Sequence, residues 1–366
     1  MNKKLCELQI GDVLKNDIWK GNTLLLKKGS KLSNLKLEKL RQWGYNKVTT
    51  TNESYSESDE KGARFQKKSL SPVFGKNQLI GYEVKMRKLF FETIALFAHD
   101  YRYGSALHDF SKMVWIEELF VETMSITEVD KLMQSLKNYD LYSYHHSVDV
   151  FILSSLLAKK MGFIELEKFS LGSMLHDIGK TVIPLSILTK EATISEIEYH
   201  VIKSHAKEGY KIVKSSGFTD DIARCCIIHH ERLDGSGYPA GLRSKELFQL
   251  DRILMIVDTY AALTSDRPYR KMFTAHEAMK IILNNPEQYD LDLLKEFMML
   301  LSIYPKNTIL KFSDGFLGRV IDVNDDDPLN VKVEYINHIK PTFKLADVTS
   351  EVIGIESFSN VELNSI

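Results

Sequence analysis

The residues best suited to chemistry are an adjacent histidine and aspartate, His176 and Asp177. An apolar run that includes Phe169, Leu171 and Leu175 precedes the pair and indicates a buried helix. Buried polar side chains need partners, and imidazole with carboxylate is a ligand mixture that Zn, Mn and Fe accept. An isolated pair of this kind is more often a helix cap or a surface hydrogen bond.

Other polar residues share this apolar setting, which strengthens the prediction of a metal site. They are His146, His205, His229, His230 and Asp258. The run R-I-L-M-I-V directly precedes Asp258, where an unpaired buried charge would cost several kcal/mol. Together with His176 and Asp177, these residues provide enough ligands for two metal ions.

The motifs around these residues resemble those of the HD-GYP family, a branch of the HD-domain metal-dependent phosphohydrolases. The resemblance covers about residues 140–280 and depends on five segments. They are His146-Ser147 with Val148 and Val150, H-D-I-G-K at 176–180, His205 with Gly209, H-H-E-R-L-D-G-S-G-Y-P at 229–239, and D-T-Y-A-A-L-T-S-D-R-P-Y-R at 258–270.

This resemblance implies a phosphodiesterase that hydrolyses the bacterial second messenger cyclic di-GMP to pGpG, to GMP or to both. By resemblance, one ion is held by His146, His176 and Asp258, and a second by His205, His229 and His230. Asp177 is the expected bridge, because one carboxylate can give an oxygen to each ion. A metal-bound hydroxide shared by the ions would then attack phosphorus without a side-chain nucleophile.

Neighbouring histidines compete for two of these positions. Adjacent helical residues differ by about 100° in direction, so His145 and His146 cannot easily reach one metal. The family pattern selects His146 and predicts that His145 lies at the surface. The spacing to Gly209 likewise selects His205 over His200.

Four residues are candidates for contacts with the substrate: Lys180, Tyr238, Arg267 and Arg270. Lys180 follows His176 by about one helical turn and could contact a phosphate oxygen, which also gives it a place in catalysis beside Asp177. Arg267 and Arg270 could bind the second phosphate of a cyclic dinucleotide as a fork. For Tyr238 and the arginines, purely structural roles remain as alternatives.

Two residues depart from the family pattern. Tyr142 stands where some members carry a glutamate that supports a third metal, so we expect a two-metal site. Ala261 replaces an aspartate that often follows the metal aspartate by three residues. Its effect could range from none to a loss of about 10- to 100-fold in ligand orientation.

Two alternatives to a cyclic di-GMP phosphodiesterase stay open. One is a catalytically weak HD-GYP module that binds cyclic dinucleotides or protein partners as a sensor. The other is an HD phosphohydrolase for a different nucleotide, including another cyclic dinucleotide. Of the metals, the ligand set favours Fe or Mn by resemblance, with Zn, Mg and Ni as further candidates.

The elements that must position these residues are mostly helical. We expect a small β-rich module at 1–50 with one helix between Ser33 and Gly44, and a flexible linker at 51–75. A helical HD-GYP domain is predicted at 76–302, followed by a β appendage at 303–366, where apolar residues alternate between tight turns. Helices between 78 and 138 are expected to pack as the core of a helical bundle, with a dimer face as the alternative. A homodimer or signalling protein partners are further possible partners of the chain.

Composition limits the remaining classes of function. The 48 basic and 49 acidic residues balance, which argues against broad binding to DNA or RNA. Cys6, Cys225 and Cys226 form no disulfide framework, and we interpret the vicinal pair as packed thiols. Because no signal core or membrane span is evident, we expect a cytoplasmic protein without membrane attachment.

Overall fold

The computed structural model describes the chain in two compact units, Met1–Arg64 and Phe65–Ile366. The described residues are 2–4, 8, 12–20, 23–26, 32, 40, 45, 47–50, 76–98, 103–104, 106–107, 110–164, 166–265, 272–324, 327–336, 342–345 and 352–357. The predicted linker at 51–75 and most of the predicted helix between Ser33 and Gly44 lie outside them.

The first unit contains two antiparallel strand pairs. β1 (Asn2–Lys4) pairs with β4 (Lys47–Thr49), and β2 (Ile18–Lys20) pairs with β3 (Thr23–Leu26). A small apolar core supports them, formed by Leu8, Leu14, Ile18, Leu32, Leu40 and Val48.

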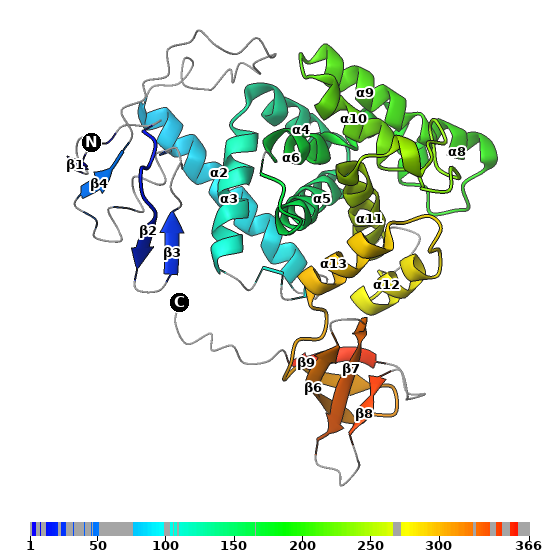
Figure 1. Cartoon of the computed structure of the whole chain (residues 1–366). Helices are drawn as coiled ribbons and strands as arrows, with labels where there is room; N and C mark the ends of the chain where they lie inside the picture. The colour runs from blue at the N-terminus through cyan, green and yellow to red at the C-terminus, as the bar shows by residue number, and fades with distance from the viewer. Residues whose placement is uncertain are drawn as a thin grey trace. The chain divides into compact units, whose positions relative to one another are not determined.

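The second unit is predominantly helical, as the fold class predicted (Figure 1). The helices before the glycine-rich loop at 235–241 are α2 (Lys76–Ala98), α3 (Phe110–Met124), α4 (Thr127–Tyr139), α5 (Leu141–Lys160), α6 (Glu167–Leu175), η2 (Ile178–Val182), α7 (Leu185–Leu188), α8 (Glu196–Lys203), α9 (His205–Ser215) and α10 (Asp220–Ile228). After the loop come η3 (Ser244–Glu246), α11 (Gln249–Leu263), α12 (Ala275–Leu283) and α13 (Leu291–Leu301).

Helix α5 is the central helix of this unit. Asp140 caps it by accepting hydrogen bonds from the backbone N–H groups of Tyr142 and Ser143, at 3.2 and 3.1 Å. Almost every residue from 146 to 158 is buried, because α3, α4, α6, α11 and α13 all contact α5. A helix that is enclosed on all sides gives the polar residues it carries fixed positions.

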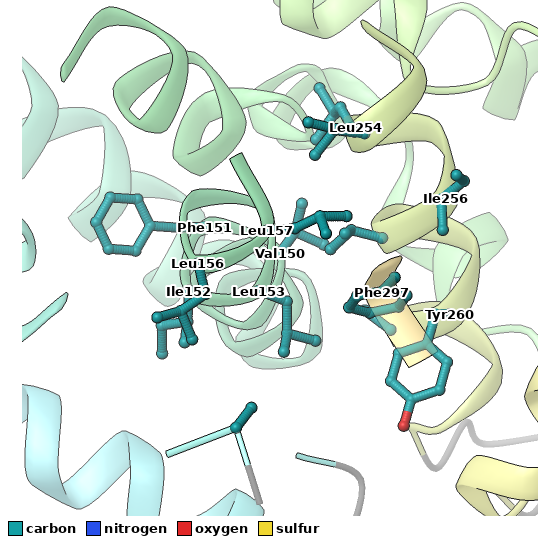
Figure 2. Packing of buried hydrophobic residues seen from close by; sticks show 14 of the residues in the cluster. Val150, Phe151, Ile152, Leu153, Leu156, Leu157, Leu254, Ile256, Tyr260 and Phe297 are labelled. Atoms are coloured by element: carbon teal, nitrogen blue, oxygen red, sulfur yellow. The ribbon is translucent and has the colours of Figure 1, made fainter. Parts of the chain in front are cut away.

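Apolar side chains of α5 pack against neighbouring helices on two opposite sides. Figure 2 shows Phe151 projecting to one side of α5, and Val150 and Leu157 projecting toward Leu254 and Phe297 on the other. Phe151 packs edge-on against Phe120 of α3, with ring centroids 6.0 Å apart. These contacts fix α5 against α11, and the two helices carry His146 and Asp258 respectively.

The predicted C-terminal strands form one antiparallel sheet of β5 (Ile309–Phe312), β6 (Leu317–Asn324), β7 (Asp327–Tyr335), β8 (Phe343–Lys344) and β9 (Val352–Ser357). Their order is β8-β7-β6-β5-β9. Buried sheet residues such as Leu310, Phe312 and Val320 belong to the same apolar cluster as the helices. Among the described helices, none combines the length and apolarity that a membrane crossing requires.

Candidate metal centre

His176 and Asp177 lie where a helix ends. Helix α6 ends at Leu175, with His176 as its C-cap, and Asp177 precedes the short 3₁₀ helix η2. The Nδ1 atom of His176 lies 2.7 Å from the carbonyl oxygen of Ser173 in the last turn. This carbonyl has no partner within the helix, so the imidazole satisfies it while Nε2 points away from α6.

Two other histidines are oriented in the same way. Nδ1 of His205 lies 2.6 Å from the carbonyl oxygen of Ile202, and Nδ1 of His229 lies 3.0 Å from that of Cys225. A carbonyl oxygen only accepts, so Nδ1 must carry the proton in each ring. In the neutral imidazoles, Nε2 therefore presents its lone pair, which is the form that binds a metal.

The first cluster consists of His146, His176 and Asp258, whose candidate ligand atoms all lie within 4.8 Å of one another. Asp258 Oδ1 is 2.9 Å from Nε2 of His146 and 3.5 Å from Nε2 of His176. All three residues are buried. Helix α11 continues past Asp258 to Leu263, so Asp258 is held within the helix rather than at its terminus.

The second cluster consists of His205, His229 and His230. Nε2 of His205 and Nε2 of His229 face each other at 3.1 Å. Because both rings donate from Nδ1 to backbone carbonyls, neither neutral ring has a second N–H for this contact. Two opposed lone pairs repel, and a cation near both nitrogens would relieve that repulsion.

Asp177 joins the two clusters through its two oxygens. Oδ2 lies 3.7 Å from Nε2 of His146 and 3.5 Å from Nε2 of His176. Oδ1 lies 3.4 Å from Nε2 of His205 and 3.8 Å from Nε2 of His229. One oxygen thus faces each cluster, as a bridging carboxylate requires.

The electrostatics keep the carboxylates charged and most imidazoles neutral. Burial alone would raise the pKa of Asp177, but Lys180 and the nearby histidines hold that pKa well below its usual range. Burial lowers the pKa of His229 to about 3, and it also lowers the pKa of His205. His176 is the exception, because Asp177 and Asp258 outweigh its burial and raise its pKa.

Unsatisfied atoms in this cluster indicate that it fits a metal. Nε2 of His176 and Oδ1 of Asp177 are buried and make no hydrogen bond to any described residue. Buried polar atoms rarely lack a partner, and imidazole nitrogens with carboxylate oxygens suit divalent transition metals. The seven predicted ligands therefore meet in one place, in two groups of three that share Asp177.

Of the residues predicted to contact substrate, Lys180 and Tyr238 lie at the cluster. Lys180 lies in η2 rather than in the helix before His176, and its Nζ is 2.5 Å from Asp177 Oδ2. The Tyr238 ring packs on His230, with centroids 4.6 Å apart. Arg267 and Arg270 lie outside the described residues.

The departures from the family pattern and the competing histidines have clear positions. The Tyr142 ring stacks on His146, with centroids 6.2 Å apart and planes 2° from parallel. Ala261 lies in α11 and is fully buried in the apolar core of the second unit. His145 is half-buried and His200 is exposed, whereas His146 and His205 are buried.

Sequence reasoning missed Glu231, which shapes the loop after the histidine pair. Glu231 is fully buried, and its carboxylate accepts hydrogen bonds from the backbone N–H groups of Ala240 and Leu242, both at 2.8 Å. Gly237 packs so closely that an added Cβ would lie 2.4 Å from Cα of Glu231. The sequence did contain a signal for this role, because an acidic residue stands just before a glycine-rich loop whose backbone amides need hydrogen-bond acceptors.

Arg232 was also missed, and it connects this loop to α11. Its guanidinium donates to the hydroxyl of Thr259 at 3.1 Å and lies over the ring of Tyr289, 5.1 Å from the centroid. Thr259 follows Asp258 directly. The contact therefore ties the position of His229 and His230 to that of Asp258.

Comparison with known proteins matches residues 132–293 to the family model described as HD domain. A cyclic di-GMP phosphodiesterase of Pseudomonas aeruginosa is 30% identical over 241 residues, covering 64% of this chain and 58% of that protein. One of Borreliella burgdorferi is 30% identical over 223 residues, 60% of this chain and 58% of that protein.

A third relative is specific for a different cyclic dinucleotide. A 3'3'-cGAMP-specific phosphodiesterase of Vibrio cholerae is 32% identical over 169 residues, covering 44% of this chain and 39% of that protein. The chain thus spans less than two thirds of the length of each of these three relatives.

Proposed function

We propose that this chain, whose residues 132–293 form an HD domain of the HD-GYP family, is a metal-dependent phosphodiesterase that hydrolyses cyclic di-GMP to pGpG, GMP or both. The proposal places the activity in the cytoplasm, with cyclic di-GMP as the partner and without DNA, RNA or a membrane. The observation that carries it is the pair of clusters joined by Asp177, with one carboxylate oxygen facing each.

The residues that would hold the first ion are His146, His176 and Asp258, and those for the second are His205, His229 and His230, with Asp177 shared. Fe or Mn is the preferred metal, with Zn, Mg and Ni as further candidates. Divalent ions, when bound, act as Lewis acids toward phosphoryl oxygens and lower the pKa of water.

The protein's own groups prepare the site for an anionic substrate. Lys180 lies against Asp177 and can donate to a phosphate oxygen, since its ammonium has three N–H donors. Tyr238 covers His230 at the edge of the second cluster. Arg267 and Arg270 keep their proposed role as a fork for the second phosphate, as their spacing suggests.

The chain offers no competing nucleophile among the thiols described. Burial raises the pKa of Cys225 and of Cys226, so neither is a thiolate near neutral pH. Cys226 Sγ instead lies 3.4 Å from the carbonyl oxygen of Leu175, which it can use as an acceptor. This arrangement supports hydrolysis by activated water rather than through a covalent intermediate.

The test is hydrolysis by protein purified anaerobically and reconstituted separately with Fe(II) and Mn(II). Cyclic di-GMP and 3'3'-cGAMP are supplied in parallel, and the products are separated by chromatography. We expect pGpG or GMP from cyclic di-GMP in at least one metal form. Faster hydrolysis of 3'3'-cGAMP would favour another cyclic dinucleotide, and no product with confirmed metal content would favour a binding module.

A further inference from the structure

One lysine beside the candidate metal centre pairs with no carboxylate of the described residues. Lys203, the last residue of α8, is half-buried, and no carboxylate among the described residues pairs with its Nζ. By contrast, Lys180 pairs with Asp177 at 2.5 Å, and Lys190 pairs with Glu198 at 2.7 Å. A half-buried ammonium without an anion keeps its donors and its charge for another partner.

Two aromatic rings fix the position of this ammonium. Nζ of Lys203 lies over the ring of Tyr199, 4.4 Å from the centroid, and over the ring of Tyr238, 5.1 Å from the centroid. Cation–π attraction holds the ammonium at both rings without neutralising its charge. The result is a positive group that has a defined place and, within the part of the chain that the structure describes, no ionic partner.

The same ring links Lys203 to the second cluster. Tyr238 packs on His230 at 4.6 Å between centroids and lies edge-on to His205 at 6.4 Å. Lys203 also precedes His205 by only two residues, at the junction of α8 and α9. Its charge is therefore presented at the rim of the proposed metal centre, one ring away from a metal-ligating imidazole.

We infer that Lys203 binds the phosphate of the cyclic dinucleotide that is not being hydrolysed, an inference that rests on the proposed function. A cyclic dinucleotide holds two phosphodiesters in one ring, so when one lies at the clusters the other must lie beside them. Hydrogen bonds from an ammonium to phosphate oxygens are charge-assisted and strong. Tyr199, which is 48% exposed, offers an adjacent ring on which a base can stack.

The experiment compares cyclic di-GMP with a substrate that has neither a second phosphate nor nucleosides. Cyclic di-GMP contains both, whereas bis-p-nitrophenyl phosphate has a single phosphodiester. Kinetic constants are measured on metal-loaded protein for the wild type, Lys203→Met, Lys203→Arg and Lys207→Met. Methionine keeps the unbranched apolar stem without the charge, and exposed Lys207 of α9 provides the control.

We expect Lys203→Met to raise KM for cyclic di-GMP about 10-fold or more, the usual effect of losing a hydrogen bond to a charged group. Turnover of bis-p-nitrophenyl phosphate should be unchanged, and Lys203→Arg should restore most of the affinity because it keeps the charge. Lys207→Met should match the wild type with both substrates.

Two results would overturn the inference while leaving the proposed function intact. One is an unchanged KM for cyclic di-GMP in Lys203→Met, and the other is an equal loss of kcat/KM with both substrates, which would mean a distorted metal site. A wild-type protein that hydrolyses bis-p-nitrophenyl phosphate but not cyclic di-GMP would instead refute the proposed function itself.

Discussion

The histidines of the candidate metal centre obtain their orientation from helix ends. His176, His205 and His229 each use Nδ1 on a backbone carbonyl three or four residues earlier. A helix leaves its last carbonyls without internal partners, so the same bond that caps the backbone also fixes the tautomer. Orientation of these ligands therefore needs no additional carboxylate behind each imidazole.

Asp177 is the residue on which both ions should depend. In Asp177→Asn, one carboxylate oxygen becomes an amide nitrogen that cannot ligate a cation, while the shape of the side chain is kept. We expect fewer than two metal ions per chain and a fall in turnover of at least about 100-fold, because the bridge orients both clusters. Metal analysis and product chromatography measure the two effects.

Asp221→Asn is the matched control for this change. Asp221 is exposed and, among the described residues, pairs only with exposed Lys168, so its loss should alter neither metal content nor turnover. An Asp177→Asn protein that retained two ions and full activity would contradict the bridging role.

Protonation of buried histidines should make the metal-free protein sensitive to acid. Burial lowers the pKa of His229 to about 3 from the ordinary 6.5. Between those values the unfolded chain binds a proton here that the folded chain does not, so the free energy of unfolding falls as the pH falls. The raised pKa of His176 opposes this effect, but the lowered pKa values of His146 and His205 add to it.

Urea unfolding of the metal-free protein at about pH 7.5 and about pH 5 tests this linkage. The midpoint should be lower at the acidic pH, and His229→Gln should reduce the difference because glutamine does not titrate. His200→Gln, at an exposed position of α8, should leave the difference unchanged. An equal pH effect in His229→Gln and the wild type would show that other groups dominate.

At the scale of elements, Gly179 allows η2 to approach α9 closely. A Cβ at Gly179 would lie 1.9 Å from the carbonyl oxygen of His205 and 2.5 Å from the backbone nitrogen of Gly209. Both obstructing atoms belong to backbone, so Gly179→Ala must separate the two elements that carry Lys180 and His205. We expect the free energy of unfolding of Gly179→Ala to be about 1–3 kcal/mol lower than that of the wild type, and we expect weaker metal retention.

Gly81→Ala provides a contrast within the same unit. Gly81 lies in α2 with no atom within 4 Å of an added Cβ, so the change should leave stability equal or raise it by up to about 1 kcal/mol. Urea denaturation measures the free energy of unfolding of the two variants, and metal analysis measures their metal content. A Gly179→Ala protein as stable and as metal-rich as Gly81→Ala would disprove the tight approach.

Elements with a strong apolar period were predictable from sequence, and the contacts between them were not. The predominance of helices within 76–302 and the alternating strands after residue 303 were confirmed, because local pattern determines them. The packing of η2, which carries Lys180, on α9 and the contact of Lys203 with the Tyr238 ring both join segments that are distant in sequence, and no local pattern reports them.

At the scale of the whole molecule, the structure contains two separate apolar cores. The first unit has its own small core, whereas the C-terminal sheet shares the core of the helices. The segment after α13 contributes to this sharing, since Tyr304 is 4% exposed and its ring lies 5.6 Å from that of His276 in α12. We therefore propose that 76–302 and 303–366, which the sequence suggested as two regions, fold as one unit.

Two truncations distinguish a shared core from an independent appendage. A protein of residues 76–366 should keep the thermal stability, metal content and turnover of the full chain, because it retains every residue of the larger apolar cluster. A protein of residues 1–302 loses Ile303, Tyr304 and the sheet, which uncovers apolar surface on α12 and α13. We expect its unfolding temperature to fall by about 5 °C or more, measured by circular dichroism with metal bound. If 1–302 instead matched the full chain while 76–366 unfolded early, the division of the cores proposed here would be wrong.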